Sequence, residues 1–285
     1  MSITINEARA LHKRLTSVSD SPEVDIDYLL CHVLQKPASY LRTWPEKTLS
    51  HEQEAAFRAL LLRRQAGEPI AYILGYRAFW DFELAVSKDT LIPRADTEVL
   101  VETALRMLDP LTAVPQRVLD LGTGTGAIGL ALAKECPAWA VVGCDLMPGA
   151  VKLAQHNQAR LGVTNVSFVQ SSWFEAIEGR FDLIVSNPPY IDPDDPHLSQ
   201  GDVRFEPLTA LIADDQGLAD IQHIAEQATH RLNPNGWLMF EHSYDQGDAC
   251  RRLLVRLGYQ QVETVKDYGD NDRVTLGQWL NRPEK

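Results

Sequence analysis

The sequence has few cysteines, no long apolar run and a shortage of basic residues. Its four cysteines, in 285 residues, are scattered, form no Cys-x-x-Cys pair and show no ligand spacing to the histidines. We therefore expect a reducing compartment, no disulfide framework and no metal site. No apolar run approaches the roughly 18 residues that span a bilayer. The N-terminal segment also lacks the charged-then-apolar layout of a secretion signal, so we expect a cytoplasmic protein that does not enter a membrane.

Acidic residues outnumber basic ones by 39 to 27, which gives a net charge of −12. Nearly all of this excess of acidic residues lies after residue 85, where there are 17 basic residues and 28 acidic ones. Proteins that bind nucleic acid through its phosphates usually carry a basic face. The charge balance therefore argues against sequence-independent DNA binding, and we expect no direct nucleic-acid partner.

The first 75 residues have the periodicity of helices. Apolar residues recur at i, i+3 and i+4 in two early segments and again over His51–Gln65, where the pattern stops before Gly67. A polar connection at residues 36–50 separates the second segment from the third. The pattern predicts a small helical bundle over residues 1–75. Residues 76–92 instead approach strict alternation, which predicts a β-hairpin linker.

From residue 93 to residue 285 helical and strand patterns alternate. The predicted strands are Arg117–Leu121, Ala140–Asp145, Val166–Gln170, Phe181–Ser186, Trp237–Glu241, Gln260–Lys266 and Val274–Trp279. The predicted helices are Thr97–Leu108, Ala127–Cys136, Pro148–Leu161, Gly217–Leu232 and Tyr244–Leu257. This order predicts an α/β fold with a seven-stranded, mostly parallel, doubly wound sheet. The connection between the last two strands is too short for a crossover helix, so these two should pair antiparallel.

A glycine-rich turn follows the first of these strands. The segment Asp120-Leu121-Gly122-Thr123-Gly124-Thr125-Gly126 runs from strand to helix, and its glycines let a ligand touch bare backbone. The next strand ends at Asp145, where an acid can bind both hydroxyls of an adenosine ribose. An exposed strand-end acid is the plainer interpretation of Asp145 alone. Together, the turn and the acid predict a nucleoside cofactor across the ends of two strands.

The glycine turn by itself leaves the cofactor open. Gly124–Gly129 matches the dinucleotide pattern G-x-G-x-x-G, which indicates NAD. Read from Asp120, the same turn is Asp-x-Gly-x-Gly-x-Gly and resembles motif I of S-adenosylmethionine methyltransferases, which we favour. A purely structural turn is the third interpretation. Trp173, after the third strand, would then lie beside the adenine, or else it fills the core with Phe174.

The fourth strand runs directly into Asn187-Pro188-Pro189-Tyr190. Two prolines remove two N–H donors and leave a stiff loop with outward carbonyls. An –NH2 group offers two hydrogens, and Asn187 Oδ1 and the Pro188 carbonyl can accept one each, while Tyr190 adds an aromatic face. Such a clamp would orient an amide or exocyclic amine for methyl transfer without a strong base. A Pro-Pro turn is often only a stiff loop, but its place after strand four favours the functional interpretation.

With these segments the chain resembles the peptide chain release factor N5-glutamine methyltransferases, the PrmC/HemK family. The resemblance covers nearly the whole chain and includes Gly67–Ala71, Phe79-Trp80, Leu91–Glu98, the glycine loop, Val185–Ile191, Asp202–Leu208 and Asp267–Asp270. Ala95 departs from the family pattern, which has a second proline there. The resemblance implies a class I S-adenosylmethionine-dependent methyltransferase domain at residues 93–285 behind a release-factor-binding helical domain.

The same resemblance implies a reaction and assigns residues to it. The implied substrate is the glutamine of the Gly-Gly-Gln loop of release factors, methylated on its side-chain nitrogen (N5). Gly122–Gly126 would hold the methionine end of S-adenosylmethionine, Asp145 the ribose, and Trp173 would neighbour the adenine. Asn187, Pro188, Pro189 and Tyr190 would hold the glutamine amide, with Asn187 also touching the cofactor. We expect a monomer.

Other functions remain open at this stage. The Asn-Pro-Pro-Tyr loop also suits a flipped adenine, which makes an N6-adenine DNA methyltransferase the enzymatic alternative, although no basic cleft or target-recognition insert is visible. A catalytically silent S-adenosylmethionine-binding adaptor is a third hypothesis, which the intact acceptor loop disfavours. For Arg94, Asp96, Glu98 and Glu206 the sequence does not decide between a structural role, such as capping a helix, and the substrate entrance.

Overall fold

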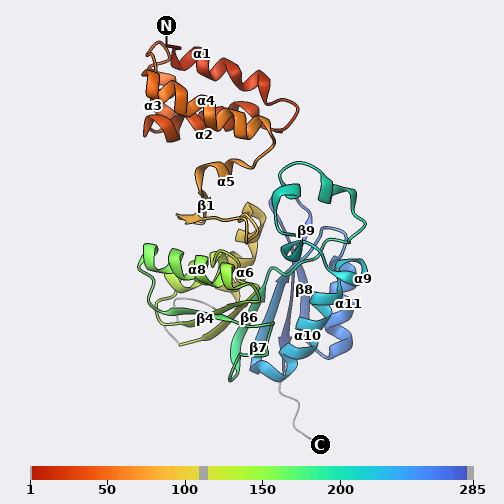
Figure 1. Cartoon of the computed structure of the whole chain (residues 1–285). Coiled ribbons are helices and arrows are strands. Elements are labelled where there is room, and N and C mark those ends of the chain that lie inside the picture. Colours follow the sequence, from red (N-terminus) through yellow and green to blue (C-terminus); the bar gives the residue numbers. More distant parts are fainter. Residues whose placement is uncertain (1, 109–114, 281–285) are drawn as a thin grey trace, which may run out of the picture. The chain divides into compact units, whose positions relative to one another are not determined.

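The computed structural model describes residues 2–108 and 115–280. Its contacts divide the chain into two compact units (Figure 1). The first unit consists of Met1–Tyr76 and Pro196–Phe205, and the second of Arg77–Asp195 and Glu206–Lys285. A ten-residue stretch from the second half of the chain therefore returns to the N-terminal unit. No helix within the described residues is long and apolar enough to cross a membrane.

The first unit is helical, as predicted. Its elements are α1 (Ile5–Arg9), η1 (Ala10–Arg14), α2 (Pro22–Leu34), α3 (Ala38–Thr43), α4 (His51–Gln65), α5 (Ile70–Leu74), η4 (Pro196–Ser199) and η5 (Val203–Phe205). Capping boxes begin α1 at Thr4 and α4 at Ser50, where a side chain satisfies otherwise unpaired backbone N–H groups. The connection predicted at residues 36–50 was wrong in one respect, because it contains α3. That helix buries only Leu41, so it carries no readable apolar period.

The hairpin is formed by β1 (Tyr76–Phe79) and β2 (Phe82–Ala85). Phe79 and Phe82 are buried in the same apolar cluster as the central sheet, so the predicted linker region packs with the second unit. Asn157 fastens β2 there, because its Oδ1 accepts from the Ala85 N–H at 2.8 Å and its Nδ2 donates to the Ala85 carbonyl at 3.0 Å.

The second unit is built on a seven-stranded sheet in the order β5-β4-β3-β6-β7-β9-β8. Its strands are β3 (Arg117–Leu121), β4 (Ala140–Asp145), β5 (Val166–Gln170), β6 (Phe181–Ser186), β7 (Leu232–Glu241), β8 (Gln260–Lys266) and β9 (Asp272–Trp279). All seven predicted strands are confirmed, and the last two pair antiparallel as predicted. Strand β7 begins five residues earlier than predicted, because Leu232 pairs with Phe181 ahead of an irregularity in the register.

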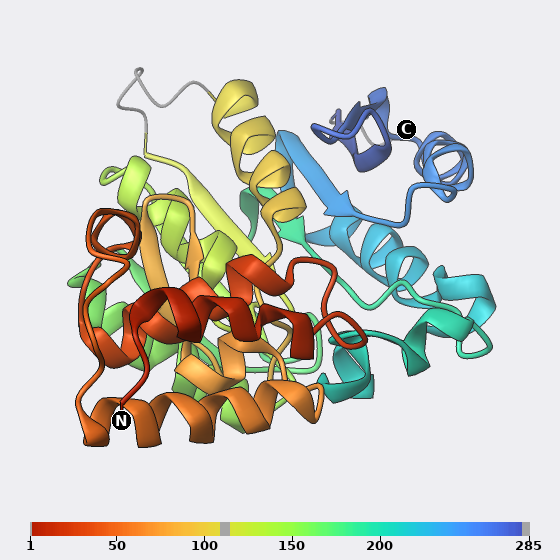
Figure 2. The ribbon, with the colours of Figure 1, turned by 90° about the horizontal axis from the view of Figure 1, so that it is seen from above.

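Helices cover both faces of this sheet. The helices of this unit are η2 (Ala95–Thr97), α6 (Glu98–Leu108), α7 (Ala127–Glu135), α8 (Pro148–Leu161), η6 (Leu208–Ala210), α9 (Asp214–Gly217), α10 (Ala219–Arg231) and α11 (Gly247–Leu257), of which α6, α7, α8, α10 and α11 pack on the sheet. Side chains of alternate strand residues pack into two separate apolar cores. One core lies beneath α6, α7 and α8, and the other lies beneath α10 and α11. Figure 2 shows yellow α6 and cyan α10 on opposite sides of the blue strand β7. The doubly wound prediction is confirmed, since side chains alternate between faces along each strand.

Candidate active site

The candidate residues meet where the strand order reverses. Strand β3 lies between β4 and β6, and its last residue, Leu121, is in register with Cys144 and Ser186. The residues at and just after these strand ends therefore come to one edge of the sheet. Ligands bind at such switch points in open α/β sheets, in the crevice outside the carboxyl ends of the strands.

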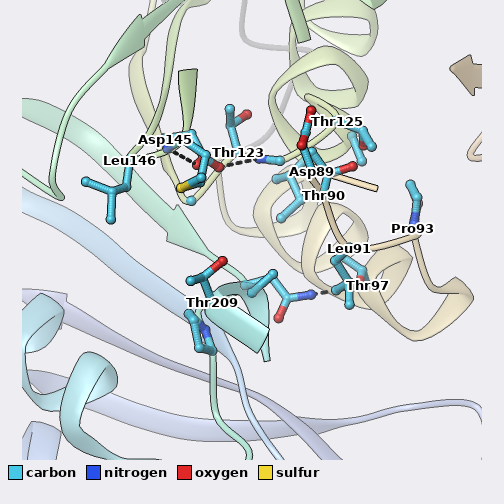
Figure 3. Close-up of a pocket in the computed structure, with 18 of the residues that line it drawn as sticks. Asp89, Thr90, Leu91, Pro93, Thr97, Thr123, Thr125, Asp145, Leu146 and Thr209 are labelled. Atoms are coloured by element: carbon cyan, nitrogen blue, oxygen red, sulfur yellow. Dashed lines mark hydrogen bonds between the residues drawn. The ribbon is translucent and has the colours of Figure 1, made fainter. Parts of the chain in front are cut away.

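A pocket at this edge brings most of the predicted residues together. Its lining includes Gly122, Thr123, Gly124, Thr125, Asp145, Trp173, Asn187 and Pro189. In Figure 3, Asp145 and Leu146 lie on one side of the pocket, and Leu91, Pro93 and Thr97 lie on the other. Gly126, Pro188 and Tyr190 stand outside the lining of this pocket as the described residues form it.

The glycine loop takes a shape that side chains would block. Gly122 and Gly126 have φ of 68° and 85°, in the left-handed region that favours glycine. A Cβ on Gly126 would approach Leu130 at 2.9 Å and Phe168 at 3.1 Å. On Gly122 a Cβ would lie 3.6 Å from the Trp173 ring, so the bare backbone here borders an aromatic surface.

A buried carboxyl supports this loop from beneath. Asp120 Oδ2 accepts from the Thr123 hydroxyl at 2.5 Å and from the Gly129 N–H at 3.0 Å. Burial raises the pKa of Asp120 to about 6, against the opposing effect of these two hydrogen bonds. Asp120 thus joins the strand end, the loop and the following helix, outside the pocket itself.

Asp145 reaches across the edge to the glycine loop. Its Oδ2 accepts from the Gly124 N–H and its Oδ1 from the Met147 N–H, both at 2.9 Å (Figure 3). Burial raises the pKa of Asp145, while the two N–H groups favour its ionised form. Each carboxylate oxygen keeps a lone pair for a further donor, such as a ribose hydroxyl. Bare backbone, a carboxylate and an aromatic ring fit a nucleoside with an amino-acid tail.

The Asn-Pro-Pro-Tyr loop presents its first residue to the pocket and turns its last one inward. Asn187 Nδ2 donates to Thr97 Oγ1 at 3.2 Å, a bond drawn in Figure 3. Tyr190 Oη donates to Glu241 Oε1 at 3.1 Å, and burial beside that carboxylate raises the pKa of the phenol. Pro188 is buried. The two ends of the loop are therefore held by side chains from other elements.

Of the four charged residues left open by the sequence, Arg94 and Glu206 pair with each other, and Asp96 and Glu98 have other partners. Arg94 lines the pocket, and its Nη2 lies 2.7 Å from the buried Glu206 carboxylate. Asp96 Oδ2 lies 3.7 Å from Arg273 Nη2. No side-chain hydrogen bond caps the start of η2, so Asp96 does not act as its cap. Glu98 Oε1 accepts from the Trp80 N–H at 2.9 Å, which ties α6 to the hairpin turn. Arg94 is therefore the one of these four residues that lines the pocket.

Several site residues were missed from the sequence. The pocket is also lined by residues with no motif of their own: Asp89, Thr90, Leu146, Met147, Thr209 and Asp220. Glu241 was missed although it carries a readable signal, an acid that ends a buried apolar strand. The same signal identified Asp145. Without a glycine loop beside it in the sequence, Glu241 lacked a second pattern to support it.

Comparisons with known proteins show which family and fold this chain resembles. Residues 8–75 match the PrmC N-terminal domain model, and residues 96–201 match the methyltransferase small domain model. The T. thermophilus 16S rRNA methyltransferase RsmC, solved in complex with AdoMet and guanosine, is similar in fold with a TM-score of 0.51. It is 22% identical, and the match covers 71% of this chain and 49% of that one.

Two curated relatives are much closer in sequence. The release factor glutamine methyltransferase of Aliivibrio fischeri is 56% identical over 274 residues, or 95% of each chain. That of Vibrio cholerae is 55% identical over 288 residues, or 100% of each chain. The chain belongs to the release factor glutamine methyltransferase family.

Proposed function

We propose that this protein transfers a methyl group from S-adenosylmethionine to the side-chain nitrogen (N5) of the glutamine in the Gly-Gly-Gln loop of peptide chain release factors. The observation that carries the proposal is the Asn187 carboxamide, which lines the pocket with its Nδ2 already donating to Thr97. The names of the close relatives support the same reaction. Because release factors act in translation, this substrate would place the protein in the cytoplasm.

The residues of the pocket fit S-adenosylmethionine. Gly122–Gly126 would cradle its methionine end with bare backbone, Asp145 would accept from the ribose hydroxyls, and Trp173 would border the adenine. When bound, S-adenosylmethionine supplies an electrophilic methyl group on a positively charged sulfur. The acidic balance of the second half of the chain suits a cationic cofactor.

Asn187, Pro188 and Tyr190 would orient the substrate amide. Asn187 Oδ1 and the Pro188 carbonyl would each accept one hydrogen of the glutamine –NH2 group, which fixes the direction of the nitrogen lone pair. Acceptors that strengthen as positive charge develops on the nitrogen favour the transition state over the ground state. Tyr190 would hold the loop in place through Glu241 rather than touch the substrate.

The helical region 1–75 would bind the body of the release factor, the hairpin region 76–92 would follow it, and residues 93–285 would carry the chemistry. Support comes from the PrmC N-terminal domain match and from two exposed apolar residues one turn apart on α2, Val24 and Tyr28, at 52% and 46% exposure. Tyr28→Ser should raise the KM for the release factor several-fold with kcat unchanged. A fall in kcat at saturating release factor would count against this division of roles.

The reaction is tested by incubating the protein with tritiated S-adenosylmethionine and a purified release factor. Label should enter the wild-type release factor and be absent when its loop glutamine is changed to alanine. Label that persists in the alanine form would overturn the substrate assignment. Duplex DNA in a parallel reaction tests the N6-adenine alternative, which neither the relatives nor the charge balance favours.

A further inference from the structure

We propose that Gln246 is a positioning residue that fixes the Asn-Pro-Pro-Tyr loop against residues 208–220, a stretch called the wall segment below. The inference rests on the proposed function and deepens it, because it concerns how the two proposed acceptors, Asn187 Oδ1 and the Pro188 carbonyl, keep their spacing. One –NH2 group can use both acceptors only when they are correctly placed relative to each other. Gln246 stands outside the pocket lining as the described residues form it, so it would act through the loop.

The Gln246 carboxamide joins the loop to the wall segment directly. Its Nε2 donates to the Tyr190 carbonyl and to the Gln216 carbonyl, both at 3.0 Å. Its Oε1 accepts from the Ser243 N–H at 2.9 Å, so the –NH2 end has to face the two carbonyls. The side chain of Gln246 is buried, at 8% exposure. Both ends of one buried carboxamide are therefore engaged in holding backbone.

A glycine lets the wall segment approach the loop this closely. Gly217 has φ of 80°, and a Cβ on it would overlap the Tyr190 carbonyl oxygen. Asp215 and Gln216, just before it, both have φ of 55°, in the left-handed region. Residues other than glycine keep this conformation only where their surroundings impose it. The hydrogen bond from Gln246 to the Gln216 carbonyl is one such constraint.

The wall segment also borders the pocket. Thr209, Ala210 and Asp220 line the pocket, and Thr209 is labelled in Figure 3. The Leu211 carbonyl in the same segment accepts from the Tyr190 N–H at 3.2 Å. Tyr190 is thus bound to the wall segment directly through its N–H, and through Gln246 by its carbonyl.

The two prolines connect this anchor to the proposed acceptors. Proline fixes φ near −65°, so the loop has few torsions that could absorb a shift at Tyr190. The other end of the loop is held separately, since Asn187 Nδ2 donates to Thr97 Oγ1 at 3.2 Å. Loss of the Gln246 donors would release one of the two ends and change the spacing of the acceptors. A misplacement of about 1 Å at a reacting group can lower the rate roughly 100-fold.

Gln246→Glu tests the proposal, because it keeps the shape of the side chain and removes its donors. At pH 8 a carboxylate would face two carbonyl oxygens, so kcat for release factor methylation should fall roughly 10- to 100-fold. The Kd for S-adenosylmethionine should stay within about threefold of wild type, because the glycine loop and Asp145 lie elsewhere on the sheet edge.

The pH profile separates a lost donor from a general loss of structure. Burial against two carbonyls raises the pKa of the introduced carboxyl, and its protonated form regains one O–H donor. From pH 9 to pH 6 the kcat of Gln246→Glu should therefore rise at least about threefold relative to that of Gln246→Met, which has no donor at any pH. Neighbouring ionisable groups, such as Asp272 beside Gly247, are present in both variants, so their titration cancels in this ratio.

Gln158→Glu is the matched control. Gln158 Nε2 also donates to two carbonyls, those of Val163 and Val166 at 3.2 and 2.7 Å, but it lies on α8 outside the pocket lining. This variant should keep kcat within about twofold of wild type. If Gln246→Glu retains a third of wild-type kcat at pH 8, if its ratio to Gln246→Met is constant with pH, or if Gln158→Glu loses as much, the inference is wrong. A wild-type protein that labels no release factor would instead refute the proposed function.

A measurement on the wild-type protein does not depend on any variant folding. With ¹⁵N-labelled glutamine, both Gln246 side-chain N–H protons should exchange with solvent much more slowly than those of exposed glutamine side chains, because both are donated to buried carbonyls. Fast exchange of either proton would overturn the proposed anchor.

Discussion

Arg64 and Asp202 form an ion pair, Nη1 to Oδ1 at 2.8 Å, although 138 residues separate them in the chain. Both belong to the helical unit, because the stretch 196–205 returns to it. Arg64 also pairs with Asp25 at 2.7 Å and donates to the carbonyl oxygens of Gly67 and Glu68. A single buried guanidinium therefore anchors the returning segment, α2 and the end of α4 to one another.

Arg64→Met should destabilise the helical unit strongly. Removing the cation leaves the Asp25 carboxylate, whose side chain is 13% exposed, without its countercharge, at a cost of about 3–5 kcal/mol. Asp202→Asn should cost no more than about 1 kcal/mol, because that side chain is 39% exposed. Urea unfolding followed by far-UV circular dichroism measures both. Arg58→Met removes an exposed i,i+4 pair and is the control. Equal midpoints for the Arg58 and Arg64 variants would contradict the prediction.

Asn187→Ala should abolish most turnover without emptying the cofactor pocket. The substitution removes the acceptor proposed for the reacting nitrogen, and loss of one such group lowers kcat by about 100- to 1,000-fold. S-adenosylmethionine affinity should change by less than about fivefold, because the glycine loop and Asp145 stay in place. Tritium transfer to a release factor gives kcat, and calorimetric titration gives the affinity. Retention of a tenth of wild-type kcat would exclude Asn187 as the central acceptor.

Asp145→Ala should act on cofactor affinity instead. It removes the acceptor expected for the ribose and also leaves the Gly124 and Met147 N–H groups without their partner. Hydrogen bonds to a charged group contribute about 1.5–3 kcal/mol each, so the Kd for S-adenosylmethionine should rise at least about tenfold. Asp145→Asn keeps one acceptor and should fall between wild type and alanine. An unchanged Kd in the alanine variant would remove Asp145 from the cofactor site.

The stability contributed by Asp120 should depend on pH. Its pKa is about 6 in the folded protein and 3.8 as the reference value. Between these values the folded protein keeps a proton that the unfolded chain has released, so stability falls as pH rises, by about 3 kcal/mol at most. The side chain of the Asp120→Asn variant cannot ionise, so the variant does not lose this stability as pH rises. From pH 4.5 to pH 7.5 the urea midpoint of the wild-type protein should therefore fall relative to that of the variant. A difference between the two midpoints that stays constant with pH would argue against the raised pKa.

Local patterns were enough to predict the sheet and most of the pocket. The strands could be predicted because apolar runs of strand length alternate with segments of helical periodicity. Such runs occur because the strands are buried between two apolar cores. Glycine and proline have backbone preferences that belong to the residue itself, so the loops at Gly122–Gly126 and Asn187–Tyr190 were readable too. Since both loops follow neighbouring parallel strands, their meeting at one edge followed from the topology.

Packing alone decided how the side chains in and around the pocket are partnered. The Thr97 hydroxyl meets Asn187 90 residues away, and Tyr190 turns toward Glu241 instead of the pocket. Likewise, the return of residues 196–205 to the helical unit depends on Arg64 finding Asp202. Hydrogen bonds and ion pairs between distant residues leave no periodic trace in a chain, because their directions exist only once the elements are packed. The sequence therefore determined which residues come together in the candidate pocket, and the tertiary structure decided which partners their side chains bind.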